Sequence, residues 1–200
     1  MIKNIIFDLG NVLISFKPAE YLEKMGYAPE SKNIILNDIF KSPEWFGLDN
    51  GNLTTAEAIE KIAARSSLKR EEITSLFNLR TEIMYPINGN ITLLPELKKR
   101  GFKLYYLSNF PEDIFDEVFN GYEFFKFFDG GLISSRVKCI KPDIKIFEII
   151  IEKYSLSKNE CLFIDDIEIN TKAAQFFGIE SFCTFGSSDF SAQIEKILAR

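Results

Sequence analysis

The feature that most constrains the fold is a series of short apolar runs, each of strand length and each ending in polar residues. The first run contains Ile2 and residues 5–7, and the other strong runs cover residues 102–107 and 161–164. Runs of this kind suit strands that are buried on both faces of a parallel sheet. Helical patterns separate the runs, which predicts an α/β fold with a doubly wound, mostly parallel, Rossmann-like sheet.

Residues 15–86 interrupt this alternation with a purely helical pattern. Thr54 and Glu57 form a capping-box pattern that opens one helix. Other helices are expected over residues 19–25, 31–40 and 69–84. We therefore expect a small helical bundle of residues 15–86, with Tyr85-Pro86 as its return hinge. The sheet domain would then consist of residues 1–14 and 87–200.

The composition narrows the class of partner. The chain has 200 residues and a net charge of −5, with both signs spread along it and no basic cluster. This distribution argues against a nucleic-acid partner. Asp8 interrupts the apolar N-terminal stretch and no cleavage site follows, so we expect no signal peptide, no transmembrane span and no membrane partner. Cys139, Cys161 and Cys183 lack CxxC spacing, which indicates buried thiols in a reduced, cytoplasmic protein.

Histidine is absent from the chain. Its absence removes Ser-His-Asp and Cys-His nucleophiles, histidine proton shuttles and histidine-ligated zinc. Any catalysis must then use carboxylates, lysine, hydroxyls, backbone amides or an oxygen-ligated cation. Mg²⁺ is a hard cation that matches this set of ligands.

Polar residues follow the three strongest apolar runs, at the end of the strands where ligands bind in an open α/β sheet. These residues, with a lysine that opens a later helix, are Asp8, Ser108, Asn109, Lys141, Asp165 and Asp166. Taken singly, each also fits a turn, a helix cap or a solvated surface position. Because the carboxyl ends of parallel strands share one edge, we expect these groups to converge there.

This set of groups suits phosphoryl transfer. The carboxylate of Asp8 can attack phosphorus and form an aspartyl-phosphate. A Mg²⁺ ion between Asp8 and Asp166 would neutralise charge and bridge the nucleophile and the phosphate. The hydroxyl and backbone amides of residues 108–109 can donate to the phosphoryl oxygens, and Lys141 supplies further positive charge.

The ordered set of motifs resembles the haloacid dehalogenase-like hydrolase superfamily. The motifs are Phe-Asp-Leu-Gly-Asn-Val around Asp8, Ser108-Asn109 after a strand, Lys141 in Lys-Pro-Asp, and Asp165-Asp166 after a strand. The match covers about residues 1–14 and 87–185, and residues 15–86 are placed like that family's helical cap. The first motif is also similar to that of bacterial sugar-phosphate phosphatases acting on α-D-glucose 1-phosphate. The resemblance therefore implies a Mg²⁺-dependent phosphatase whose substrate is a small phosphorylated metabolite.

The resemblance also implies residue roles. Asp8 would be the nucleophile and a Mg²⁺ ligand, and Gly10 would offer its carbonyl to the metal. Asp166 would be a further metal ligand, with Asp165 beside it. The phosphate would be held by Ser108, Asn109 and Lys141.

One departure from the family pattern concerns proton transfer. Most phosphatases of this family carry an Asp two residues after the nucleophile as general acid/base, and here that position is Gly10. Without this acid, phosphates of acidic leaving groups should react fastest, unless a group from the cap or a bound water protonates the leaving oxygen.

Two alternatives to the phosphatase follow. The family's dehalogenases also lack that Asp, so dehalogenation of a small 2-halo acid is one of them. The Asp165-Asp166 pair favours a cation, which dehalogenation does not require. The other alternative is a catalytically weak member that binds a phosphorylated ligand or a partner protein.

Overall fold

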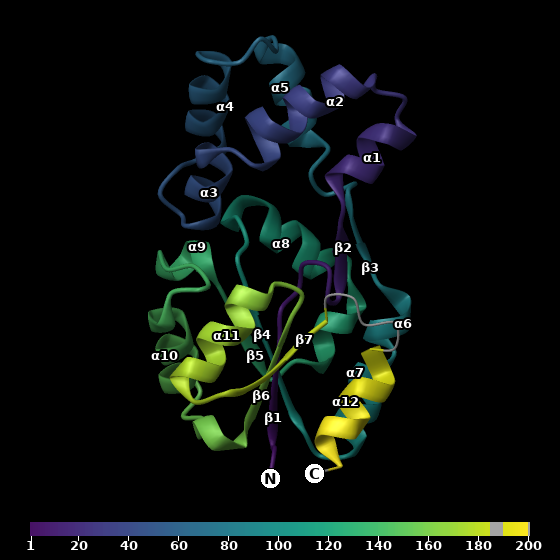
Figure 1. Ribbon diagram of the computed structural model, residues 1–200, viewed down its shortest axis with the longest axis vertical. Helices are drawn as coiled ribbons and strands as arrows, with labels where there is room; N and C mark the ends of the chain where they lie inside the picture. The colour runs from purple at the N-terminus through teal and green to yellow at the C-terminus, as the bar shows by residue number, and fades with distance from the viewer. Residues whose placement is uncertain (185–189, 200) are drawn as a thin grey trace.

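The computed structural model describes residues 1–184 and 190–199, and its centre is a five-stranded sheet (Figure 1). All neighbouring strands pair in parallel, in the order β5-β4-β1-β6-β7. The strands are β1 (Asn4–Phe7), β4 (Lys103–Ser108), β5 (Gly130–Ile133), β6 (Cys161–Asp165) and β7 (Glu180–Cys183). The predicted parallel sheet is confirmed. The sequence also predicts a last strand over residues 179–185; β7 lies within this range, and Phe185 is outside the described residues.

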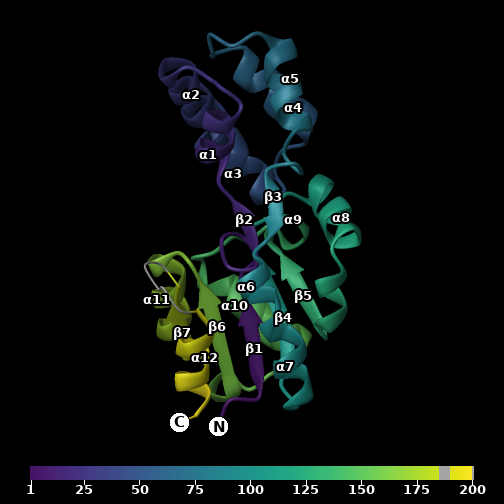
Figure 2. The ribbon, with the colours of Figure 1, turned by 90° about the vertical axis from the view of Figure 1, so that its right-hand side faces the viewer.

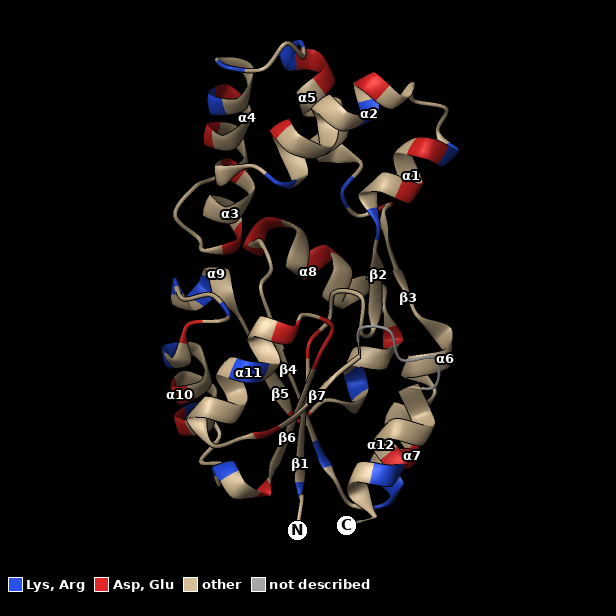
Figure 3. Cartoon of the chain, viewed as in Figure 1, with Lys and Arg blue, Asp and Glu red and all other residues tan. Residues whose placement is uncertain are grey.

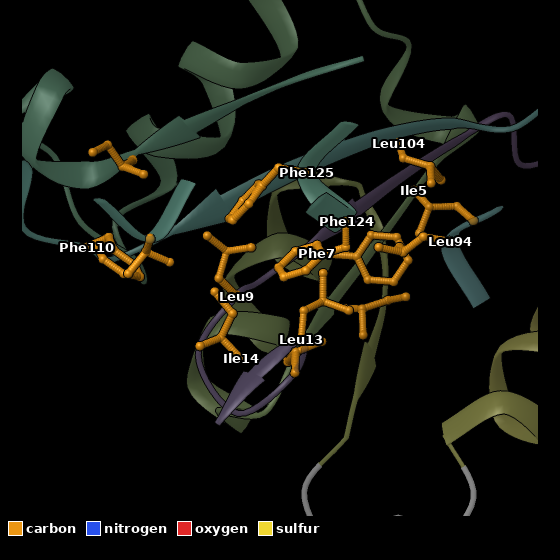
Figure 4. Close-up of a cluster of buried hydrophobic side chains, with 14 of the residues drawn as sticks. Ile5, Phe7, Leu9, Leu13, Ile14, Leu94, Leu104, Phe110, Phe124 and Phe125 are labelled. Carbon is orange, nitrogen blue, oxygen red and sulfur yellow. The ribbon is translucent and has the colours of Figure 1, made fainter. Parts of the chain in front are cut away.

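Helices cover both faces of this sheet, because successive side chains of a strand point to opposite sides. Ile5 and Phe7 of β1 pack into one cluster with Leu94 of the helix α7 (Leu93–Lys99) (Figure 4). Side chains of the helices α8 (Glu112–Gly121) and α12 (Phe190–Leu198) belong to the same cluster. Ile6 packs on the other face against α10 (Ile144–Lys153) and α11 (Glu168–Phe177). Both faces of β1 are thus buried, as the continuous apolar run predicted.

Local signals set the ends of the two helices that begin at the carboxyl edge of the sheet, α10 and α11. Asp143 caps α10 by accepting a hydrogen bond from the backbone N–H of Lys145 at 2.9 Å. Gly178 ends α11 with φ of +99°, a conformation that favours glycine. Lys141 lies shortly before the start of α10 at Ile144, and Asp166 lies shortly before the start of α11 at Glu168.

A second layer of helices lies beyond the carboxyl edge of the sheet (Figures 1 and 2). Its elements are α1 (Pro18–Lys24), α2 (Pro29–Ile35), the π-helical turn η1 (Leu36–Phe40), α3 (Pro43–Asp49), α4 (Thr55–Ala63) and α5 (Arg70–Asn78). They share a separate hydrophobic cluster that includes Ile35, Ile62 and Ile73. We call α1–α5 the cap helices. The predicted capping box of Thr54 and Glu57 is present at the start of α4.

Two short antiparallel strands, β2 (Ile14–Phe16) and β3 (Met84–Pro86), connect the cap helices to the sheet layer. The expected helix over residues 69–84 is therefore wrong at its end, because α5 stops at Asn78. Met84 is buried whereas Tyr85 is exposed, and this alternation is typical of a strand. The division into residues 1–14 and 87–200 against residues 15–86 stays a prediction.

Shorter helical elements complete the described chain: α6 (Asn88–Ile91), η2 (Glu123–Phe127), α9 (Ser134–Val137) and η3 (Lys158–Glu160). Acidic and basic residues are interspersed on the helices of both layers (Figure 3). Among the described residues, no helix combines the length and apolar character needed to cross a bilayer.

The sheet core yields a prediction about stability. Phe147 of α10 is fully buried, and its ring lies edge-on to Phe163 with the centroids 5.2 Å apart. We expect Phe147→Ala to lower the free energy of unfolding by about 3–5 kcal/mol, measured by urea denaturation, because the ring leaves a cavity. Phe176→Ala is the matched control, since Phe176 is 82% exposed and should change stability by about 0.5 kcal/mol or less. Equal losses in the two variants would contradict this packing.

Candidate active site

The structure brings most of the predicted site residues to one cavity at the carboxyl edge of the sheet. Asp8 follows β1, Ser108 ends β4 and Asp166 follows β6, and β1 lies between the other two strands. The cavity measures about 220 Å³, and the predicted residues that line it are Asp8, Gly10, Ser108, Asn109, Lys141 and Asp166. Asp165 is the exception, because it lies behind this lining and is fully buried.

Lys141 joins two of these groups electrostatically. Its Nζ lies 2.9 Å from Asp8 Oδ1 and 2.6 Å from Asp165 Oδ2. All three side chains are buried. Burial opposes the charged ammonium, but the carboxylates of Asp8 and Asp165 outweigh it and raise the pKa of Lys141. The lysine therefore remains a cation beside Asp8.

Asn109 fixes the backbone that carries this lysine. Its side-chain oxygen accepts a hydrogen bond from the Lys141 N–H at 2.9 Å, and its Nδ2 donates to the Lys141 carbonyl at 3.0 Å. The side-chain amide is thus engaged by Lys141 through its oxygen and through one of the two N–H groups of Nδ2. Ser108 is buried beside Asp8, where its hydroxyl lowers the pKa of that carboxyl.

Asp165 is held by three donors. Its Oδ1 accepts a hydrogen bond from the Ile167 N–H at 2.8 Å, and both oxygens lie 3.1 Å from Asn170 Nδ2. Its Oδ2 also pairs with Lys141. Asn170, which lines the cavity from the first turn of α11, was not predicted from the sequence. Its spacing of five residues after Asp165 is the only signal, and such a spacing is common.

The carboxylates fit a hard cation. Asp8, Asp165 and Asp166 each offer an oxygen, and these oxygens lie within 4.8 Å of one another. Burial raises the pKa of Asp8 to about 7, with Asp165 adding to this effect and Lys141 opposing it. Burial and the charge of Asp165 also raise the pKa of Asp166. A bound divalent cation favours the ionised carboxylates, so the residues present fit Mg²⁺.

A tight turn after β1 shapes the near wall of the cavity. The Leu9 carbonyl accepts hydrogen bonds from the N–H groups of Leu13 and Ile14, at 2.9 and 2.8 Å. Asn11 adopts φ of +52°, and its Oδ1 accepts from the Phe16 N–H at 3.0 Å. A Cβ at Gly10 would meet no atom within 4 Å, so the space above Gly10 is open.

The cap side of the cavity was not found from the sequence. Phe16, Trp45, Asp49 and Met84 line it, and Asp49 is the polar side chain among these four. The Phe16 and Trp45 rings stack with centroids 5.6 Å apart. Asp49 lies in an Asp-Asn-Gly-Asn stretch that predicts an ordinary turn. Burial, together with the charge of Asp8, raises the pKa of Asp49 to about 7.

Comparison with known proteins identifies the family. A family model described as haloacid dehalogenase-like hydrolase matches residues 2–178. The chain belongs to the haloacid dehalogenase-like hydrolases. This hydrolase is 27% identical over 180 residues to the sesquiterpene phosphatase astK of Aspergillus oryzae. The matched region covers 88% of this chain and 87% of that protein. The predicted superfamily and the predicted class of enzyme are confirmed.

Solved structures of similar hydrolases share the fold. The HAD family enzyme bt-2542 of Bacteroides thetaiotaomicron, in complex with magnesium and inorganic phosphate, is 25% identical with a TM-score of 0.75, and the match covers 96% of this chain and 99% of that one. The L-2-haloacid dehalogenase of Xanthobacter autotrophicus is 15% identical with a TM-score of 0.66, covering 100% of this hydrolase and 83% of that chain. The similarity to sugar-phosphate phosphatases stays a prediction.

The raised pKa of Asp8 predicts how magnesium stabilises the hydrolase at different pH. In the metal-free protein the proton on Asp8 is favoured by folding, so this stabilisation is lost as pH rises from about 4 to 7. Magnesium binding has the opposite sign, because it requires the ionised carboxylate. We expect the Tm increase caused by Mg²⁺ to be larger at pH 8 than at pH 5.5, measured by thermal unfolding at constant ionic strength.

The control for this measurement is Asp166→Asn, which removes a carboxylate that lines the cavity. The variant should lose most of the Mg²⁺-dependent increase in Tm at both pH values. An increase that is independent of pH, or unchanged in this variant, would contradict the metal site.

Proposed function

We propose that this hydrolase is a Mg²⁺-dependent phosphatase that acts on a small phosphomonoester through an aspartyl-phosphate on Asp8. The observation that carries the proposal is the buried contact of Lys141 with Asp8 beside Asp166, in one cavity at the edge of the sheet. The phosphate and magnesium bound by bt-2542, and the name of astK as a phosphatase, support the same chemistry.

The geometry supports the following roles for the site residues. Asp8 attacks phosphorus with one carboxylate oxygen while Lys141 holds the other at 2.9 Å. Mg²⁺, when bound by Asp8, Asp166 and the Gly10 carbonyl, supplies positive charge for the phosphoryl oxygens. Ser108 and the backbone N–H of Asn109 donate to the phosphate, and Lys141 balances its charge.

Asp165 orients Lys141 and Asn170 through the hydrogen bonds described above. The resemblance also implied that Asp165 lies among the metal ligands, and its oxygen is within 4.8 Å of those of Asp8 and Asp166. Because both of its oxygens already accept protein donors, we propose that it acts mainly by holding the lysine.

The other two interpretations receive less support from the geometry. Dehalogenation needs no cation, yet three carboxylates face one lysine here. The similarity to the Xanthobacter dehalogenase concerns the fold. A catalytically weak binding protein would not require a nucleophile and its lysine to be held together in a buried ion pair.

The nucleophile can be tested directly. We expect wild-type protein to release phosphate from a phosphomonoester, to stop with EDTA and to recover with Mg²⁺. Asp8→Asn should lose the activity because an amide cannot attack phosphorus, and Asp116→Asn, an exposed change on α8, should retain it. Phosphate release is measured in all three proteins. Full turnover by Asp8→Asn would contradict the aspartyl-phosphate, and chloride release from 2-chloro acids despite EDTA would establish the dehalogenase.

The organic part of the substrate is constrained by the lining of the cavity. On the cap side of the cavity, Phe16, Trp45 and Met84 present apolar surface, and Asp49 is the polar residue of these four. A sugar phosphate, which the sequence resemblance predicts, needs several polar partners for its hydroxyls. The cap wall instead suits an apolar group, and the cavity of about 220 Å³ suits a small one. We propose a short aryl or prenyl monophosphate as the substrate. The name of astK as a sesquiterpene phosphatase also indicates an apolar organic group for that relative.

A panel of substrates tests this choice. We expect kcat/KM to be higher for phenyl phosphate and a five-carbon prenyl phosphate than for hexose phosphates. Trp45→Ala should reduce kcat/KM for phenyl phosphate by about tenfold or more, since lost apolar contact costs about 0.8 kcal/mol per CH₂. Phe46→Ala is the control, because Phe46 lies on the same helix and is 56% exposed. A preference for hexose phosphates in the wild type would establish the sugar-phosphate prediction instead.

A further inference from the structure

We propose that Asp49, at the end of α3, is the general acid/base of this hydrolase, in place of the Asp that position 10 lacks. This inference rests on the proposed phosphatase activity. Asp49 would donate a proton to the leaving oxygen and later take one from water. Neither the family match nor the similar proteins assign this residue.

Asp49 lies where a proton donor for the leaving oxygen is needed. Asp49 lines the same cavity as Asp8 and Gly10, and it lies on the cap side, where the organic part of the substrate must lie. The space above Gly10 is open, because a Cβ there would meet no atom within 4 Å. A proton donor for the leaving oxygen must therefore come from another element that faces this space. Asp49 is the carboxylic acid that the cap contributes to the lining.

The contacts of Asp49 give its carboxylate no structural role. Within the described residues its oxygens have no hydrogen-bond donor and no salt-bridge partner. Asp49 is also the last residue of α3, where the helix dipole disfavours negative charge. A half-buried carboxyl at such a place costs stability. Groups that break local rules in this way are expected at functional sites.

The backbone of Asp49 is fixed to the sheet layer. Its carbonyl accepts a hydrogen bond from the Ser134 hydroxyl, and Ser134 Oγ also accepts from the Phe110 N–H at 2.9 Å. Gly51, with φ of +67°, packs so closely on Ser135 that a Cβ there would clash with the Ser135 carbonyl. Asp49 is thus tied to the segment that follows Ser108 and Asn109.

The protonation of Asp49 fits both halves of the reaction. The groups whose charges act on it are Asp8, which raises its pKa, and Lys141, which lowers it. With burial included, the pKa is about 7, so both the acid and the carboxylate are populated near neutral pH.

Two balanced steps follow. In the first, an Asp8 oxygen bonds to phosphorus, the bond from phosphorus to the leaving oxygen breaks, and the proton of Asp49 moves to that oxygen. The products are an alcohol, the aspartyl-phosphate and the Asp49 carboxylate. In the second, this carboxylate takes a proton from water while the water oxygen bonds to phosphorus and the bond to Asp8 breaks. Inorganic phosphate leaves, and Asp8 and protonated Asp49 are restored.

The test is Asp49→Asn, which keeps the shape of the side chain but cannot transfer the proton. We would measure kcat/KM with Mg²⁺ for 4-nitrophenyl, phenyl and alkyl phosphates, whose leaving groups become progressively less acidic. We expect a loss of about 10²–10⁴ with alkyl and phenyl phosphates and of about tenfold or less with 4-nitrophenyl phosphate. The wild type should show a shallow dependence on leaving-group pKa and the variant a steep one.

A second readout separates proton transfer from binding. With 4-nitrophenyl phosphate, Asp49→Asn should release a burst of nitrophenol in the first turnover, because the second step has lost its base. Glu30→Gln, which removes an exposed charge from α2, should keep the wild-type slope without a burst. Urea unfolding would establish that Asp49→Asn is folded.

Three results would overturn the proposal. An equal loss for every leaving group would make Asp49 a binding residue, and no loss would make it dispensable. A wild-type protein that releases phosphate from none of these esters would overturn the proposed phosphatase as well. Where Asp8→Asn loses activity, unchanged activity of Asp49→Asn on the phenyl and alkyl phosphates overturns the assignment of Asp49 alone.

Discussion

The site depends on one buried ammonium group. Lys141 is 3% exposed and contacts Asp8 and Asp165, so its charge joins the ends of β1 and β6 to the segment before α10. Removing one partner from such a buried arrangement costs roughly 3–5 kcal/mol, because the remaining charges lose their compensation. With Asp166 included, three carboxylates face a single lysine. The interaction that organises this edge of the sheet therefore also creates the need for a further cation.

The cap helices complete the site through contacts far from the reacting atoms. Arg80, which follows α5, is 5% exposed and pairs with Asp113 of α8 at 2.7 Å, and Thr55 of α4 donates to the same carboxylate. Ser134 holds the other side of the cap through the Asp49 carbonyl. One contact thus holds α4 and the segment after α5 on α8, and the other holds the end of α3 on the sheet layer. The wall of Phe16 and Trp45 can exclude water from the cavity only while such contacts persist.

The sequence predicted the position of a site residue where that residue directly ends or follows a strand. A continuous apolar run ending in Asp8, Ser108 or Asp165 predicts a buried parallel strand and the edge at which its last side chain lies. Asp49 could not be found in this way, because its neighbours in space come from distant segments. Asn170 lies only five residues after its partner Asp165, but that spacing is too common to mark it. The strand over residues 84–86 was missed for a similar reason. A strand of three residues has too few positions to show alternation, and its partner Ile14–Phe16 is separated from it by the whole cap.

The glycine at position 10 connects these observations. A general acid on the turn after β1 would sit on the sheet layer and be in place whether or not the cap covers the site. An acid on α3 is in place only when α3 lies against α9, as the Ser134 and Ser135 contacts hold it. Proton transfer and exclusion of water then depend on the same contact, so the aspartyl-phosphate would form and break only in a covered site. The apolar residues that choose the substrate, Trp45 above all, lie on the same short helix as Asp49. Selection of the organic group and activation of its oxygen are therefore properties of one element, α3.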